Sequence, residues 1–263
     1  MNYSAGKLVS RPSKRHVRSL FLDVAGQKKK YFLKQSGIQS FHRVLKNWCR
    51  LRSPLSDSAK ELLVLELFRD QGIPVMKAVA WGAHSLLGWP MRGFILVEEV
   101  VGKEFRDVYR AAPLRIRRRL FRLYGELMGT LHRKGIDSKV RPEDLICVSD
   151  NYKDFRKCFV VIDRERGHPF LMRMSMEQCG IHLGDIWVKG MHRIGLGERS
   201  ELLAFLSGYL TGAGQRNDRE ARGVIYSNLV ERASCRATEV LYHDNRFETL
   251  RRGFQIRYGF NLD

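Results

Sequence analysis

The sequence predicts an α+β protein built from two lobes. Short strand-like segments fill the first hundred residues, with helices among them, and mostly helical segments follow. The composition changes near Val100-Val101-Gly102, which we take as the link between the lobes. With 44% hydrophobic and 10% aromatic residues, the 263-residue chain can bury a substantial core, so disorder is excluded as its main state.

These observations predict three parts of the chain. A basic segment covers residues 1–14, an N-terminal lobe covers 15–101, and a C-terminal lobe covers 102–263. The C-terminal lobe ends in an extension, residues 217–263, to which the sequence assigns no role.

Two predicted strands open the N-terminal lobe as a hairpin. They are Val17–Asp23 and Lys30–Lys34, and Ala25-Gly26-Gln27 supplies the turn between them. Further along, Pro74–Trp81 is expected to be extended, and Phe94–Val97 to be a short buried strand.

Two helices are predicted between these strand pairs. The first is indicated by apolar residues at helical spacing, which are Ile38, Phe41, Leu45 and Trp48. We expect this stripe to be buried in the core. The second helix follows a capping-box pattern, Ser58-Ala-Lys-Glu61, and ends at Gly72.

The C-terminal lobe opens with the strongest helical pattern in the chain, Leu114–Lys134, which Gly135 ends. A strand pair is expected next, at Leu145–Val148 and Phe159–Ile162. Further helices are predicted at Ser200–Leu210 and Glu220–Val240, and the last twenty residues are not assigned.

The charge of the chain favours polyanionic partners. It contains 47 Lys and Arg against 28 Asp and Glu, a formal net charge of +19. Nucleic acid, ATP and an anionic membrane face all fit this charge. The densest cluster is either a binding patch or a solvated helix face, and consists of Arg115, Arg117, Arg118, Arg119 and Arg122.

Several patterns bear on the location of the protein. No stretch without Asp, Glu, Lys or Arg exceeds 14 residues, so no membrane span is expected. The first residues lack the apolar run of a secretory signal, which predicts a cytoplasmic protein. Five cysteines without a Cys-x-x-Cys pair indicate reduced thiols and no zinc site. Of these, Cys147 and Cys158 lie in apolar surroundings and are expected in the core.

Asp163 and Lys34 are the first candidates for chemistry. Asp163 directly follows the apolar run Phe159–Ile162, and carboxylates at strand ends hold Mg²⁺ in phosphoryl-transfer enzymes. An exposed loop acid is the alternative. Lys34 ends a strand of an N-terminal sheet, from which a lysine can bind nucleotide phosphates. An ordinary surface lysine is its alternative in so basic a chain.

Glu61 and Asp144 are the next candidates. Glu61 either pairs with Lys34 or caps its own helix with Ser58. Asp144 lies in the loop after the long helix, 19 residues before Asp163. That spacing suits a loop-strand-turn-strand unit, in which two acids can share metal ions.

The order of these parts is that of a protein-kinase-like fold. A strand lysine and a helix glutamate come first, then Glu98 and Glu99 at the end of an apolar strand, a long helix, an acid-bearing loop and a strand aspartate. The sequence also resembles the lipopolysaccharide core-sugar kinases, the Kdo and heptose kinase family of Gram-negative bacteria. The resembling segments are colinear over residues 15 to 210, and are Arg15–Lys34, Ser40–Trp81, LHRKGI (131–136) and FVVIDRER (159–166).

This resemblance implies a kinase that uses ATP and Mg²⁺. Lys34 matches the family's nucleotide lysine, and Glu61 matches the helix glutamate that orients it. Asp163 matches the metal-binding aspartate, and Asp144 stands at the position of the second metal ligand. Glu98 and Glu99 stand at the segment that contacts adenine through backbone groups.

The resemblance also implies partners and a location. The acceptor is a lipopolysaccharide core glycolipid or a related sugar. Because that acceptor is a membrane lipid, the protein is expected in the cytoplasm, peripheral on the inner face of the inner membrane. The basic surface suits such an anionic membrane face.

The chain departs from the family where the catalytic aspartate is expected. Counting from Gly135 puts Val140 at that position, whereas counting back from Asp144 puts Lys139 there. Neither side chain can accept a proton from a sugar hydroxyl in the usual way, so Asp137 is the nearest candidate base. Ser10–Lys14, where a glycine-rich loop is expected, contains no glycine.

Two alternatives to an active kinase therefore stay open. The first is a pseudokinase, in which the same fold serves as a binding module without the catalytic aspartate. The second is a nucleic-acid-binding protein, which only the charge supports, because the sequence carries no helix-turn-helix, ribonucleoprotein or zinc-finger signature.

Overall fold

The computed structural model describes residues 7–10, 15–49, 54–163, 170–195, 197–214 and 219–258. Those residues divide into two compact units, and each is described by itself. The first unit contains the described residues up to Val101 together with Asp163. The second contains Gly102–Ile162 and the described residues from Phe170 onward.

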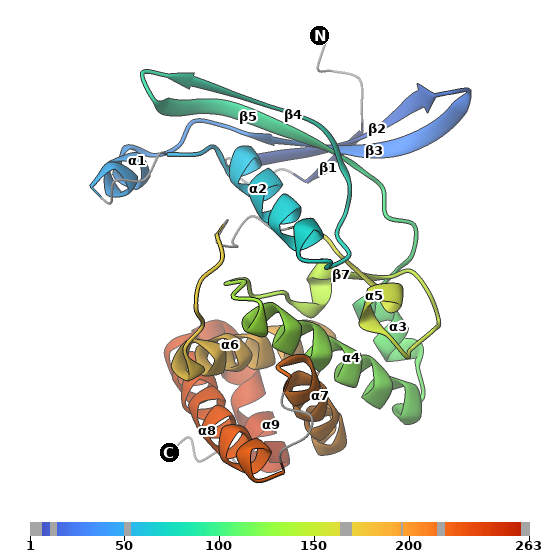
Figure 1. Ribbon diagram of the computed structural model, residues 1–263, viewed down its shortest axis with the longest axis vertical. Helices are drawn as coiled ribbons and strands as arrows, with labels where there is room; N and C mark the ends of the chain where they lie inside the picture. Colours follow the sequence, from blue (N-terminus) through green and yellow to red (C-terminus); the bar gives the residue numbers. More distant parts are fainter. Residues whose placement is uncertain are drawn as a thin grey trace. The chain divides into compact units, whose positions relative to one another are not determined.

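The first unit is a five-stranded antiparallel sheet with two helices (Figure 1). The strand order is β1-β2-β3-β5-β4. The strands are β1 (Lys7–Ser10), β2 (Arg15–Val24), β3 (Gln27–Ser36), β4 (Ala78–Leu86) and β5 (Trp89–Glu98). The helices are α1 (Phe41–Trp48) and α2 (Asp57–Asp70).

The predicted hairpin is confirmed as β2 and β3. Its two-residue loop is Ala25-Gly26, with φ values of 54° and 76°. Two successive positive φ values define the type I′ turn, whose twist matches that of paired strands. The predicted strand Phe94–Val97 lies within β5, which pairs with both β3 and β4.

Helix α2 packs on β3, β4 and β5 through a buried apolar face that includes Leu62, Leu65 and Phe68. The expected capping box is wrong by two residues. The N-cap is Ser56, whose hydroxyl accepts a hydrogen bond from the Ala59 N–H at 3.1 Å. Because the helix begins earlier than predicted, Glu61 lies in its second turn and faces the interior instead of the cap.

The prediction that the stripe of α1 lies in the core is also wrong. Phe41 is 64% exposed, and Ile38 and Leu45 are exposed as well, whereas Val44 is fully buried. The physical reason is that α1 does not lie beneath the sheet. It is an eight-residue helix held beside the β4–β5 hairpin, where Phe41 stacks on Trp89 with ring centroids 5.5 Å apart.

The second unit combines a small sheet with a set of helices. The sheet order is β6-β7-β8, with β6 (Lys103–Glu104), β7 (Leu145–Cys147) and β8 (Phe159–Val161). The first helices are α3 (Phe105–Ala111), α4 (Leu114–Arg133), η1 (Pro142–Asp144) and α5 (Phe155–Cys158). The later ones are α6 (Met176–Ile194), α7 (Arg199–Gly212), α8 (Arg219–His243), η2 (Asn245–Phe247) and α9 (Glu248–Tyr258).

The sequence predicted α4, α7 and α8 but missed α3, α6 and α9. Phe105, at the start of α3, lies at the centre of the aromatic core, where its ring contacts those of Phe121, Tyr124 and Phe159. Cys147 and Cys158 are buried as expected. None of the helices in the described part of the chain has the length and apolarity needed to cross a membrane.

Helices α4 and α7 touch backbone to backbone. A Cβ added at Gly125 of α4 would lie 1.9 Å from the carbonyl oxygen of Phe205, and one at Gly208 of α7 would lie 1.9 Å from that of Arg122. Real Cβ atoms do not come this close, so both positions exclude every side chain at the present helix separation. This contact sets the distance between the two helices.

We expect Gly125→Ala to destabilise the second unit, although alanine favours a helix by about 1 kcal/mol over glycine. The helices must separate to admit the methyl group, and such overpacking costs roughly 1–3 kcal/mol or more. Gly223→Ala on α8 is the matched control, since its Cβ would meet nothing within 4 Å. Urea unfolding should show a midpoint below that of the wild type for Gly125→Ala but not for Gly223→Ala. A Gly125→Ala midpoint equal to that of the wild type would contradict the backbone contact.

Candidate active site

A buried lysine forms the centre of the candidate site in the first unit. Lys34 lies on β3 and is only 8% exposed. Its Nζ is 2.7 Å from Oε1 of Glu61, which is fully buried on α2. The predicted ion pair between these side chains is therefore confirmed. A buried ammonium needs a carboxylate partner, because desolvating an unpaired charge is very costly.

Asp163 is the second carboxylate beside Lys34. Its Oδ1 lies 3.2 Å from the Lys34 Nζ, and its side chain is 42% exposed. The residue follows β8 directly and has a φ of 59°. A non-glycine residue in this left-handed region costs about 1 kcal/mol, and such strain concentrates at functional sites. Lys34, Glu61 and Asp163 are thus brought together, as the sequence predicted from their order.

Glu98 and Glu99 end β5 in the same unit. Their carboxylates pair with Lys29 and Lys30, at 3.4 and 2.5 Å. Their N–H groups donate to the carbonyl groups of Lys77 and Lys30, at 2.9 and 3.0 Å. An adenine contact through these two N–H groups would therefore require existing hydrogen bonds to break.

In the second unit, the carboxylate of Asp144 is held by its own loop. Its Oδ2 accepts from the Arg141 N–H at 2.9 Å and from Nε at 3.2 Å, while Oδ1 accepts from the Arg141 guanidinium at 3.0 Å. The side chain is almost completely buried. Asp144 therefore serves as the cap of the short helix η1. The Ile162 N–H, next to Asp163 in the chain, donates to the Asp144 carbonyl at 2.7 Å.

Both positions at which a catalytic aspartate was expected are occupied by non-acidic residues with structural contacts. Val140 is fully buried, and its carbonyl accepts from the Tyr124 hydroxyl at 2.6 Å. Lys139 pairs with the buried Asp185 of α6. Arg236 of α8 donates to the same carboxylate at 2.8 Å.

The charges around Asp185 keep it ionised. Burial raises the pKa of this carboxyl, but the hydrogen bond and charge of Lys139, followed by Lys189 and Arg236, lower the pKa below its usual value. Asp185 is therefore an anion that binds Lys139 to α6. No sequence motif pointed to it, because α6 itself was not predicted.

Asp137 begins a chain of hydrogen-bonding groups that the sequence did not reveal. Its Oδ1 lies 3.0 Å from Nε2 of His182 on α6. Nδ1 of His182 lies 3.2 Å from Nε2 of His132, and Nδ1 of His132 lies 2.8 Å from the Tyr209 hydroxyl. The chain thus runs from the catalytic-loop region through α6 and α4 to α7.

The protonation of His132 gives this chain a direction. Burial and the neighbouring His182 lower the pKa of His132 from 6.5 to about 3, so its ring is neutral at pH 7. A neutral His132 ring has one donor nitrogen, and every contact has a donor when His182 donates to Asp137. The Tyr209 hydroxyl donates to His132, His132 donates from Nε2 to His182, and His182 donates from Nε2 to Asp137. The chain thereby orients the Asp137 carboxylate.

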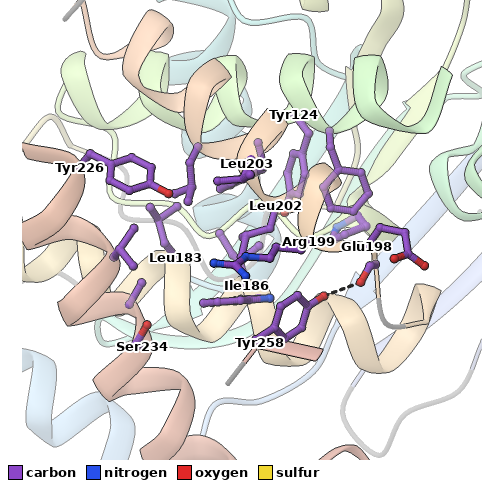
Figure 2. A pocket seen from close by; sticks show the side chains of 18 residues that line it. Tyr124, Leu183, Ile186, Glu198, Arg199, Leu202, Leu203, Tyr226, Ser234 and Tyr258 are labelled. Atoms are coloured by element: carbon purple, nitrogen blue, oxygen red, sulfur yellow. Dashed lines mark hydrogen bonds between the residues drawn. The ribbon is translucent and has the colours of Figure 1, made fainter. Parts of the chain in front are cut away.

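The second unit also contains an apolar pocket of about 190 Å³ (Figure 2). Leu183, Ile186 and Leu202 line it, and at its edge the Tyr258 hydroxyl donates to the Gly197 carbonyl at 2.7 Å. None of the predicted site residues lines this pocket. Its apolar walls do not suit the triphosphate of a nucleotide.

Known proteins share the fold of this chain. A solved structure described as WaaP in complex with acyl carrier protein matches with a TM-score of 0.58 and 21% identity, over 88% of each chain. One of titin kinase and its flanking domains matches with a TM-score of 0.45 and 14% identity, over 92% of this chain and 46% of that one. The second similarity is too low to carry an argument. A search of curated proteins found no match.

The fold is that of the protein-kinase-like class, as the order of the sequence motifs predicted. A family model described as the lipopolysaccharide kinase (Kdo/WaaP) family matches residues 4–174, more than half of the chain. The chain belongs to this family.

We expect His132 to make the stability of the second unit sensitive to acid. Its pKa is about 3 in the folded state and 6.5 as the ordinary value, so the unfolded chain binds the proton first. Above pH 6.5, His132 is neutral in both states and does not lower the free energy of unfolding. As the pH falls from 6.5 toward 3, protonation of His132 in the unfolded chain lowers that free energy by up to about 1.4 kcal/mol per pH unit.

Urea unfolding at pH 7 and pH 5 should therefore show a smaller acid loss for His132→Asn than for the wild type. His243→Gln, which changes an exposed histidine of the same unit, should keep the wild-type loss. Equal losses in the wild type and His132→Asn would contradict a neutral, buried His132.

Proposed function

We propose that the chain transfers the γ-phosphoryl group of ATP to a hydroxyl of a lipopolysaccharide core sugar or a related sugar. Membership of the family supports the reaction class, with ATP as the phosphate donor. The observation that carries the proposal is the buried Lys34, held between Glu61 and the partly exposed Asp163. The three residues form the constellation that positions and neutralises phosphates in kinases.

Lys34 is the phosphate-binding group in this proposal. Glu61 fixes the ammonium at 2.7 Å and is itself fully buried, so the lysine is oriented before nucleotide binds. Phosphoryl transfer depends mainly on positioning and on charge neutralisation, and a preorganised ammonium contributes to both.

In the reaction, the acceptor oxygen bonds to the γ-phosphorus while the bond from that phosphorus to the leaving ADP oxygen breaks. The hydroxyl proton must pass to a base. Asp137 is the proposed base, since it lies in the loop region of the missing aspartate and its carboxylate is oriented by His182 at 3.0 Å. Lys139, paired with Asp185, cannot take this role.

Magnesium fits the two predicted ligands unequally. Asp163 presents a partly exposed carboxylate of the type that Mg²⁺ prefers, so it is the proposed ligand. Asp144 does not fit as arranged, because Arg141 donates to both of its oxygens. A bound magnesium ion would neutralise phosphate charge, and no step here depends on Asp144.

We expect Asp163→Asn to weaken ATP binding in the presence of Mg²⁺ by tenfold or more, because the amide supplies no negative charge to a cation. Asp70→Asn, an exposed acid on α2 of the same unit, is the matched control and should bind as the wild type. Isothermal calorimetry with and without Mg²⁺ measures both. Unchanged metal-dependent affinity in Asp163→Asn would overturn its assignment as ligand.

For the base, we expect Asp137→Asn to slow single-turnover phosphorylation of a core oligosaccharide by about 10²–10⁴-fold. Asparagine keeps an oxygen that can accept from His182, but it cannot take up the hydroxyl proton. ATP affinity should stay unchanged. An unaltered rate would show that the chemistry proceeds without Asp137.

A specific observation favours a second candidate, the pseudokinase. Lys139 and Val140 occupy the expected position of the catalytic aspartate, and both are tied into the second unit by Asp185 and Tyr124. In this alternative, Lys34 and Glu61 still bind nucleotide but no phosphoryl group is transferred. ATP binding without turnover on any core-sugar acceptor, in the wild type as well as in Asp137→Asn, would establish it.

Membrane attachment belongs to the proposal, since the proposed acceptor is a glycolipid. The sequence pointed to the arginines at the start of α4. Two of these are engaged within the unit: Arg117 pairs with Glu201 at 3.0 Å, and Arg118 donates to Ser200 at 3.1 Å. Arg115 and Arg119 stay the predicted membrane contacts of α4.

A further inference from the structure

The first unit carries an apolar tip where the β4–β5 hairpin meets α1. Leu87, in the hairpin turn, is 93% exposed, and Leu86 before it is 58% exposed. Phe41 and Ile38, at the start of α1, are also largely exposed. Exposed apolar side chains contribute nothing to the core. Their grouping on one surface indicates that this surface contacts a membrane or a partner.

This tip is one connected structure. Phe41 stacks on Trp89, whose Nε1 donates to the Gln39 carbonyl at 3.3 Å. The Gln39 N–H in turn donates to the Pro90 carbonyl at 3.3 Å. Leu86 pairs with Trp89 across the hairpin. The segment before α1 is thus fixed to the turn, and the exposed apolar residues belong to one surface.

The turn residue contradicts the local preferences of the backbone. Leu87 and Gly88 have φ values of 49° and 76°, the same type I′ geometry as Ala25-Gly26. Asparagine or glycine is normal at such a position, whereas leucine is strained there. A strained and almost fully exposed leucine disfavours the folded state on two counts, and sites of this kind are typically functional.

The charge around the tip identifies its partner. Residues 37–56 and 71–97 contain no Asp or Glu at all. They contain six Lys and Arg, of which Arg92 is exposed on β5 close to the turn. Asp57 of α2 is an acid beside the tip, since its Oδ1 accepts from the Gln39 side chain at 3.5 Å. Apolar residues at a tip, an aromatic stack behind them, and segments that carry basic residues without acidic ones are the features of a surface that enters an anionic bilayer.

The hairpin at the other end of the sheet differs in its turn and in its charge. Phe21, near the β2–β3 tip, is 59% exposed, and Lys28 lies over its ring with Nζ 5.3 Å from the centroid. The next two lysines pair with Glu98 and Glu99. The charges of Lys29 and Lys30 are therefore compensated within the unit, and the β2–β3 turn carries alanine in place of leucine.

We propose that the β4–β5 tip and the start of α1 insert into the interfacial region of an anionic lipid bilayer. Leu86, Leu87 and Phe41 would enter the acyl boundary, and Arg92 would contact lipid phosphates. The proposed function supplies only the purpose of this insertion, which is to bring the chain to a glycolipid acceptor. Because vesicle binding is measured without ATP or acceptor, a failure of membrane insertion can be distinguished from a failure of the proposed kinase activity.

The test is co-sedimentation of the full chain with vesicles of phosphatidylcholine, with and without about one third phosphatidylglycerol. The wild type should bind the anionic vesicles more tightly than the neutral ones. Leu87→Asn should lower the partition coefficient about tenfold, because one leucine is lost from the acyl boundary. Asparagine accepts the left-handed turn, so this variant should fold at least as stably as the wild type.

Two matched controls separate insertion from other effects. Ala25→Asn introduces the same asparagine at the matching turn position of the other hairpin, and Ile256→Asn removes an exposed apolar residue of α9. Both should bind as the wild type. High salt should weaken wild-type binding without abolishing it, since apolar insertion is not screened.

Three results would overturn the proposal. In the first, Leu87→Asn binds anionic vesicles as tightly as the wild type does. In the second, the wild type binds neutral and anionic vesicles equally, and in the third it binds no vesicles. Loss of binding in Arg115→Gln/Arg119→Gln with retention in Leu87→Asn would place the contact on α4 instead.

Discussion

The first unit depends on one constraint: the ammonium group of Lys34 is buried and must be paired. Glu61 meets this demand from α2, so the helix can lie on the sheet in only one rotational position. The same ammonium attracts Asp163, which takes up a left-handed backbone conformation directly after β8. The strain and the buried charges disfavour folding, and features of this kind concentrate at functional sites.

The second unit shows a different use of charge. The loop between α4 and η1 contains Lys139, and Asp185 on α6 balances the charge of that lysine. Arg141 similarly neutralises Asp144. The charges of this loop are thus paired internally, and a partly exposed carboxylate remains at Asp137, held by histidine.

Parts of this arrangement were predictable because they are local. The order of lysine, glutamate and aspartate along the chain, and the apolar strand before Asp163, predicted the fold and the Lys34–Glu61 pair. The exposed α1 was not predictable, because helical periodicity shows which residues share a face but not whether that face has a partner. The capping box misled because Ser56 and Ser58 are equally good caps in sequence.

The histidine chain could not be predicted for a physical reason. His132 and His182 are 50 residues apart, on α4 and α6, and only the tertiary fold brings their rings within 3.2 Å. Cys179, Leu183 and Ile186 do recur at helical spacing, but glycines at 180, 184 and 190 lower the helical propensity of that segment. Without α6, neither His182 nor Asp185 had a position, so Asp137 lacked a partner in the sequence analysis.

The backbone contact of α4 with α7 has a consequence for how this protein can change over evolutionary time. Gly125 and Gly208 each face a carbonyl group, and no intermediate residue size exists between glycine and alanine. Neither glycine can therefore be replaced by a series of small changes in side-chain size. A larger residue is tolerated only after the two helices have moved apart. Such a step would also pull His132 away from Tyr209, because one lies on each helix. Descendant sequences should thus keep or lose the glycines and the histidine chain together.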